Sequence, residues 1–220
     1  LVTLPVIQKR LIRAARHAQK GCIVATQMLL SMVKNPLPTR AETTDVANAV
    51  MDGADCVMLS EETAIGDYPV KVCEMINGIA TNAEEYFLER TKGPYQPAHR
   101  HETAKNLAYS ASLLADSLGS AGLFSHTTSG STARLLSSRR PRQRIYALTP
   151  RPEVIKYLNF FFGVTPALSD ENIEDHLKRV ETYVQETDII KEGETVVITS
   201  GQPTPGQKDT STNNLKIYYK

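Results

Sequence analysis

Two kinds of apolar pattern alternate along the first ninety residues. Residues 5–20 carry apolar side chains at helical spacing, from Val6 to Ala18, and this spacing predicts an amphipathic helix. Two short segments, the apolar run of residues 22–25 and residues 55–59, predict buried parallel strands.

Each of these strands is followed by a loop and then by a predicted helix. The first helix spans about residues 44–52 and ends at Gly53, and the second is a long amphipathic helix over about residues 69–89. The order is therefore helix, strand, helix, strand, helix. The loops after the strands lie at the carboxyl ends of both strands.

Residues 92–98 contain one glycine and two prolines and are the best linker candidate. After them strands and helices alternate, which predicts a doubly wound α/β domain with right-handed crossovers. We therefore expect two domains, residues 1–91 and 99–220. The second contains helices at about residues 102–118, 132–139, after Pro152 and at 171–186, and strands at 122–125, 144–148, near Val164, 195–199 and 215–219.

The composition is that of a globular protein, with 41% hydrophobic residues and a formal net charge of +1. This charge balance argues against a nucleic-acid or membrane-surface binder, and no apolar run is long enough to cross a bilayer. Cys22, Cys56 and Cys73 form no Cys-x-x-Cys pair, so we expect a reducing, cytoplasmic compartment. Cys22 and Cys56 are expected to be small buried hydrophobes. The chain begins with Leu1 instead of Met, which indicates a piece of a longer chain.

Residues 139–144 form the one dense basic run, Arg-Arg-Pro-Arg-Gln-Arg. Such a run can contact RNA or anionic ligands, or serve as a nuclear signal. It has no interleaved aromatic residues and lies between a helix and a strand, so a solvated surface is expected. The five histidines show no metal-ligand spacing, and His126, beside a polar loop, is interpreted as structural.

That polar loop, Thr127–Thr132, follows a strand and opens a helix. Hydroxyls, a glycine and backbone N–H groups at a helix N-terminus form a cradle for anions. The same residues also serve as an ordinary helix cap. The residues alone leave both interpretations open.

Polar residues also follow both strands of the first half. Thr26 and Gln27 come after the first strand, and Ser60, Glu61 and Glu62 come after the second. Two adjacent glutamates suit paired carboxylate chemistry or a magnesium site. Adjacent residues on a turn point apart, so one solvated and one hydrogen-bonded glutamate is the simpler expectation.

Three segments of the first half, residues 25–42, 45–55 and 57–70, resemble the pyruvate kinase family in their order and spacing. The resemblance continues into the second half through residues 127–132 and 162–166. It implies that the first half is the last part of a TIM barrel, in which active sites lie at the carboxyl ends of the strands. The expected fold class is α/β: a partial TIM barrel, then a three-layer α/β/α domain with a mostly parallel five-stranded sheet.

The resemblance also implies an activity, transfer of the phosphoryl group of phosphoenolpyruvate to ADP, followed by protonation of the enolate to pyruvate. Thr26 matches the threonine beside the substrate, and a hydroxyl can orient an enolate and relay a proton through water. The residues that match the supports of the active site are Gln27, Ser60 and Glu62. Those that match a subunit interface are Arg40 and Glu42, which implies a homotetramer.

The family's Mg²⁺ ligands, K⁺ ligands, transition-state lysine and nucleotide-binding residues match nothing in this chain. No metal ligand is therefore assigned here, and the chain alone is expected to be inactive.

In the second half the resemblance implies a site for a sugar-phosphate or nucleotide effector, in which Thr127, Ser129, Gly130, Ser131 and Thr132 hold a phosphate. Many effector-regulated relatives have Lys or Arg where this chain has Thr128 and Ser131, and Arg134 is the nearest basic residue. The loop of residues 200–208 would close over the effector. The alternative is a stand-alone module that binds a phosphorylated metabolite without catalysis.

Overall fold

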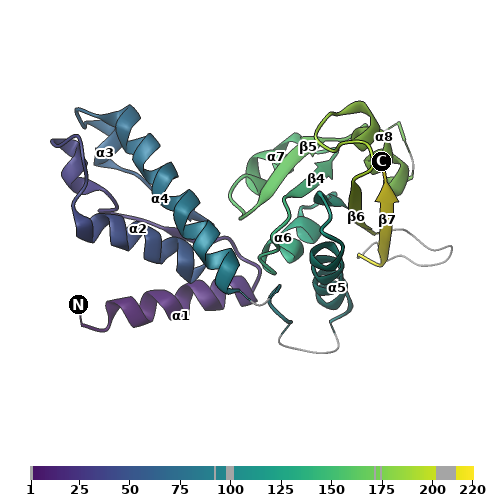
Figure 1. Ribbon diagram of the computed structural model, residues 1–220, viewed down its shortest axis with the longest axis horizontal. Coiled ribbons are helices and arrows are strands. Elements are labelled where there is room, and N and C mark those ends of the chain that lie inside the picture. The colour runs from purple at the N-terminus through teal and green to yellow at the C-terminus, as the bar shows by residue number, and fades with distance from the viewer. Residues whose placement is uncertain (1, 92, 98–101, 171, 174, 202–211) are drawn as a thin grey trace. The chain divides into compact units, whose positions relative to one another are not determined.

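The structure is a computed structural model, and it describes every residue except 1, 92, 98–101, 171, 174 and 202–211. The chain divides into two compact units, Leu1–Lys92 and Gly93–Lys220 (Figure 1). Each unit has a hydrophobic core of its own. In the part of the chain that is described, no helix is long and apolar enough to cross a membrane.

The first unit consists of helices around a two-stranded parallel sheet. Its elements are α1 (Leu4–His17), β1 (Ile23–Val24), the 3₁₀ helix η1 (Leu30–Val33), α2 (Arg40–Asp52), β2 (Cys56–Val57), α3 (Glu61–Ala64) and α4 (Pro69–Arg90). Helices α2 and α4 lie side by side (Figure 1). The core contains Met28, Leu29, Met32, Val46 and Val72.

Helix α2 begins four residues earlier than the sequence predicts. Thr39 and Glu42 form a capping box, in which each side chain accepts a hydrogen bond from the backbone N–H of the other residue. This pair satisfies N–H groups that have no partner within the helix, so the helix extends back to Arg40. Its end at Gly53, in a left-handed conformation, is where the sequence predicts it.

The two strands of this unit differ from the prediction. Each spans two residues, and Ile23 is 48% exposed, while Cys22 and Cys56 are only half-buried. The expectation that residues 22–25 and 55–59 form buried strands, with Cys22 and Cys56 buried, is therefore wrong for this unit. Parallel strands become buried when neighbouring strands and helices cover them. In the described residues β1 and β2 pair only with each other.

The second unit is a doubly wound sheet. Its elements are α5 (Thr103–Leu118), β3 (Gly122–His126), α6 (Ser131–Ser137), β4 (Ile145–Thr149), α7 (Pro152–Leu158), β5 (Val164–Leu168), α8 (His176–Glu186), β6 (Thr195–Ser200) and β7 (Asn214–Tyr219). The strand order is β5-β4-β3-β6-β7, and all neighbours are parallel except β6 and β7.

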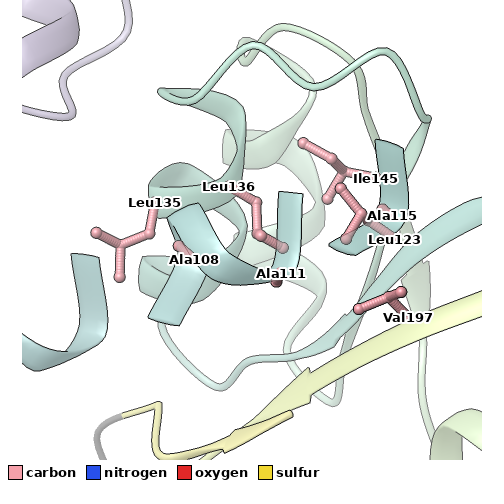
Figure 2. Packing of buried hydrophobic residues seen from close by; sticks show 8 residues of the cluster. All are labelled: Ala108, Ala111, Ala115, Leu123, Leu135, Leu136, Ile145 and Val197. Atoms are coloured by element: carbon pink, nitrogen blue, oxygen red, sulfur yellow. The ribbon is translucent and has the colours of Figure 1, made fainter. Parts of the chain in front are cut away.

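Alternate residues of these strands build two cores on opposite faces of the sheet. On one face Leu123, Ile145 and Val197 pack with residues of α5 and α6 (Figure 2). On the other face Phe124 and Ile198 pack with residues of α8. Together with the strand order, this three-layer arrangement confirms the predicted fold class.

Two predictions for the second unit need correction. Helix α8 begins at His176 instead of residue 171, because the Asp175 carboxylate caps it by accepting hydrogen bonds from the N–H groups of Leu177 and Lys178.

The basic run is not a fully solvated surface. Arg139 and Arg140 are buried: Arg140 lies over the Phe162 ring, and Arg139 donates to the carbonyl oxygen of Tyr95 at 3.0 Å. The Tyr95 N–H in turn donates to the Arg139 carbonyl at 2.9 Å, so this part of the expected linker packs on the second unit.

Candidate functional site

The loop that follows β1 passes through an unusual backbone conformation. Thr26 and Gln27 have φ angles of 71° and 55°, and both side chains are exposed. The left-handed region costs about 1–2 kcal/mol for a residue with a Cβ atom, and it is rarer still for a β-branched residue. Two such residues in succession mean that contacts elsewhere hold this loop in place.

Glu62 supplies one of these contacts, because it joins the loops that follow the two strands. Its side chain is buried, and its carboxylate accepts hydrogen bonds from the Leu29 N–H at 3.2 Å and the Ser60 N–H at 2.7 Å. Burial raises the pKa of Glu62, but these N–H donors outweigh that effect and leave the pKa below its usual value. Its neighbour Glu61 is exposed. The pair thus matches the expectation of one hydrogen-bonded and one solvated glutamate.

Glu42 supplies the second contact, from the first turn of α2. Its carboxylate accepts hydrogen bonds from the Ser31 N–H at 2.6 Å, the Ser31 hydroxyl at 2.5 Å, and the Thr39 N–H and hydroxyl at 2.8 Å each. Burial acts to raise the pKa of Glu42, but the donors of Ser31 and Thr39 lower it by more. Arg40, the first residue of α2, is exposed.

These carboxylates do not form a metal centre. Across the described ranges no three His, Cys, Asp or Glu side chains are grouped as metal ligands. Glu42 and Glu62 instead accept hydrogen bonds from N–H and O–H donors, which a metal ion would have to displace. The Glu42 and Glu62 carboxylates therefore do not fit a Mg²⁺ or K⁺ site.

The hydroxyl loop of the second unit follows β3. The Thr127 N–H donates to the Leu148 carbonyl at 2.9 Å, and Gly130, with φ of 79°, precedes α6. The exposed hydroxyls of Ser129 and Ser131 lie 3.2 Å apart, at the surface of the loop.

Thr132 does not share this exposure. Its buried hydroxyl lies 2.7 Å from that of Thr212, beyond the loop that the sequence expects to close over an effector. Most of that loop, residues 202–208, lies outside the described residues.

His126, interpreted from the sequence as structural, lies at the same end of the sheet with two residues that the sequence did not single out, His176 and Arg179. Arg179 donates to Nε2 of His126 at 2.9 Å, and the ring of His176 stacks on that of His126. Nδ1 of His176 lies 2.7 Å from the carbonyl oxygen of Gly201, at the end of β6. The helical spacing of His176 and Arg179 was the available signal, because residues three apart share one face of a helix.

An apolar groove between α2 and α4 is a separate feature of the first unit. Its walls include Leu37, Met51, Met75, Ile79 and Tyr86. Neither Thr26 nor Glu62 lines it. It is therefore distinct from the loops at the strand ends.

Helices around two parallel strands, followed by a five-stranded doubly wound sheet, define a two-domain α/β protein with polar loops at the carboxyl ends of its strands. Residues 1–73 match the model of the pyruvate kinase barrel domain, and residues 105–218 match that of the pyruvate kinase alpha/beta domain. The chain belongs to the pyruvate kinase family.

Curated relatives support this membership. The chain is 42% identical to a pyruvate kinase of Agrobacterium vitis and 40% identical to one of Thermococcus litoralis, over 97% and 98% of its own length. It is 35% identical to plastidial pyruvate kinase 3, chloroplastic, of Arabidopsis thaliana, over 97% of its length. The chain spans 45%, 46% and 38% of these three relatives, so it corresponds to less than half of each.

Proposed function

We propose that this chain is the C-terminal portion of a pyruvate kinase, which transfers the phosphoryl group of phosphoenolpyruvate to ADP and releases pyruvate and ATP. The observation that carries the proposal is the match to both family domains in one chain, with the Thr26 and Glu62 loops at the strand ends. Family membership favours this enzyme over a stand-alone binding module.

Within that reaction the chain contributes one edge of the active site. The Thr26 hydroxyl orients the enolate and passes a proton to it through water, since a hydroxyl is too weak an acid to act alone. Gln27, Ser60 and Glu62 support the loop that carries Thr26. When bound, Mg²⁺ and K⁺ supply charge stabilisation to the transferred phosphoryl group, and their ligands belong to the part of the enzyme outside this chain.

The chain by itself is proposed to be inactive, because phosphoryl transfer depends on metal ions and cationic side chains around the phosphate. The experiment compares two proteins in an assay of pyruvate formation from phosphoenolpyruvate and ADP with Mg²⁺ and K⁺. One is the 220-residue chain, for which we expect no turnover. The other is a hybrid in which the part of the Agrobacterium vitis relative that the chain does not cover precedes Leu1, and here we expect turnover.

A substitution in the hybrid tests the role of Thr26. Thr26→Val keeps the β-branched shape and removes the hydroxyl, so kcat should fall by about 100-fold or more. Thr81→Val, on the exposed surface of α4, is the matched control and should leave kcat unchanged. An inactive hybrid, or a fully active Thr26→Val variant, would contradict the proposal.

The second unit is proposed to bind a sugar-phosphate or nucleotide effector through Thr127, Ser129, Gly130, Ser131 and Thr132. The exposed hydroxyls of Ser129 and Ser131 support this, because they are placed to donate to a phosphate. Calorimetric titration with a hexose bisphosphate and with a nucleoside monophosphate separates the two effector classes. A Ser129→Ala, Ser131→Ala double variant should bind the effector more weakly, whichever of the two classes it belongs to. Unchanged affinity would show that the loop is not part of the effector site.

The whole enzyme is proposed to be a cytoplasmic homotetramer. Arg40, exposed at the start of α2, is proposed to lie at a subunit interface together with the first turn that contains Glu42. Arg40→Glu in the active hybrid should shift the mass measured by light scattering below that of a tetramer. Unchanged mass would contradict this position for the interface.

A further inference from the structure

Glu42 makes more hydrogen bonds than a helix cap requires. The capping box uses only the Thr39 N–H and side chain, yet the same carboxylate also accepts from the N–H and hydroxyl of Ser31. Ser31 is eleven residues earlier in the chain and lies in η1, the 3₁₀ helix of the loop that follows β1. One carboxylate thus joins the start of α2 to that loop.

Glu42 and Glu62 hold the loop at neighbouring points. Glu62 accepts a hydrogen bond from the N–H of Leu29, just before η1. Glu42 accepts one from the N–H of Ser31, in the first turn of η1. The first N–H groups of a helix have no partner inside the helix and favour negative charge. Both carboxylates therefore bind at the N-terminus of η1, where backbone donors are available.

This anchoring bears on the two left-handed residues. Thr26 and Gln27 lie between β1, fixed by its pairing with β2, and η1, fixed by the two glutamates. An unfavourable backbone conformation persists only when the structure around it holds both of its ends. Releasing the η1 end lets Thr26 and Gln27 relax toward ordinary backbone angles, which moves the Thr26 hydroxyl.

We propose that Glu42 is a positioning residue for Thr26: through its hydrogen bonds to Ser31 it holds the loop after β1 in its left-handed conformation. This inference rests on the proposed function only in that it takes Thr26 as the catalytic residue. The same hydrogen bonds connect the first turn of α2, which carries Arg40, to the loop of Thr26. A displacement of that turn displaces Ser31 as well.

The experiment uses Glu42→Gln, with Glu61→Gln as the matched control. Glutamine has the same shape, but its amide offers one acceptor oxygen and brings its own N–H₂ toward the donors of Ser31 and Thr39. Glu61 has the same chemistry and is exposed, one residue before Glu62. Amide hydrogen exchange of Ser31 in the 220-residue chain reports directly on the hydrogen bond from the Ser31 N–H to Glu42, and it needs no enzymatic activity.

We expect exchange at Ser31 to be about tenfold or more faster in Glu42→Gln than in the parent chain, and unchanged in Glu61→Gln. Ser31→Ala, which removes one donor and leaves the backbone bond, should give a smaller increase and guards against general misfolding of the glutamine variant. Equal exchange in Glu42→Gln and the parent chain, or an unprotected Ser31 amide in the parent chain, would overturn the proposal.

The hybrid enzyme distinguishes positioning from a purely structural role. Glu42→Gln should lower kcat about tenfold with little change in KM for ADP, because ADP is held outside this chain. Glu61→Gln should leave both constants unchanged. Loss of thermal stability with an unchanged kcat would overturn positioning and leave Glu42 structural. An inactive parent hybrid would refute the proposed function. The exchange result would still show whether Glu42 holds Ser31 in place.

Discussion

The imidazole rings of His126 and His176 stack with their centroids 4.0 Å apart and an angle of 25° between their planes. His126 ends β3 and His176 opens α8, so the stack joins a central strand to the helix that covers it. Arg179 donates to Nε2 of His126, which requires that nitrogen to be unprotonated. Burial, followed by the charges of His176 and Arg179, lowers the pKa of His126 to about 3.

This pKa predicts that acid destabilises the second unit. His126 has a pKa of about 3 in the folded chain and an ordinary value of 6.5, so between these values the unfolded chain binds more protons. The contribution of His126 to the free energy of unfolding should be complete above pH 6.5. It should fall as the pH decreases toward 3, by up to about 1.4 kcal/mol per pH unit. Urea titrations followed through the ring resonances of Phe124 and Tyr146 measure it.

His126→Gln should remove much of this dependence, because glutamine can accept from Arg179 but does not titrate in this range. His17→Gln, on the exposed surface of α1, is the control and should retain it. If His126→Gln kept the full slope, the dependence would belong to other groups.

Substitution by alanine at Gly66 and at Gly78 should change the stability of the first unit in opposite directions. A Cβ atom on Gly66 would lie 2.4 Å from the backbone oxygen of Glu62, whereas one on Gly78, inside α4, would meet no atom within 4 Å. Gly66→Ala should destabilise the first unit by about 1–3 kcal/mol, because backbone atoms of α3 must move. Gly78→Ala should stabilise it by about 0.5–1 kcal/mol, because alanine is the better helix former.

Chemical denaturation of the two variants, followed through residues of the first unit, checks these signs. Equal effects of the two substitutions would show that the close approach of Gly66 to Glu62 is not maintained.

Glycine at position 27 should stabilise the loop after β1 relative to alanine. Gln27 has a φ angle of 55°, which costs about 1–2 kcal/mol for a residue with a Cβ atom and little for glycine. Glycine is also more flexible when unfolded, so we expect Gln27→Gly to be about 0.5–1 kcal/mol more stable than Gln27→Ala. Thermal unfolding of both variants measures the difference, and an advantage for alanine would contradict the left-handed conformation.

The hydroxyls of Thr132 and Thr212 should be coupled energetically. They are 2.7 Å apart and buried, and a hydrogen bond of this kind contributes about 1 kcal/mol. A double-mutant cycle with Thr132→Val and Thr212→Val isolates the interaction free energy, for which we expect about 0.5–1.5 kcal/mol. An interaction free energy near zero would show that contacts other than this hydrogen bond hold Thr132 and Thr212 together.

Local patterns predicted most of the elements. The apolar spacing of residues 69–89 marks α4, and Gly53 ends α2 where its left-handed conformation requires a glycine. The capping box of Thr39 and Glu42 is also local, yet the apolar pattern places the start of α2 four residues too late. The lesson is that a cap of Thr with Glu three residues later outweighs a weak apolar pattern in its first turn.

Contacts between distant residues were beyond such patterns. Arg139 and Arg140 belong to a basic run that predicts exposure, but Phe162 and the backbone of Tyr95 cover them. The pairing of Thr132 with Thr212 joins residues 80 apart in the chain. No periodicity within one element encodes such a partner.

The alternation of strands and helices, the α/β class and the polar residues after each strand can be read from sequence patterns, because backbone geometry sets the periods of helix and strand. Tertiary packing, in contrast, brings Glu42 and Glu62 to the loop of Thr26, and it brings His126 to His176 and Arg179. A carboxylate or an imidazole accepts many donors equally well, so its partner is the donor that the packed fold brings within reach.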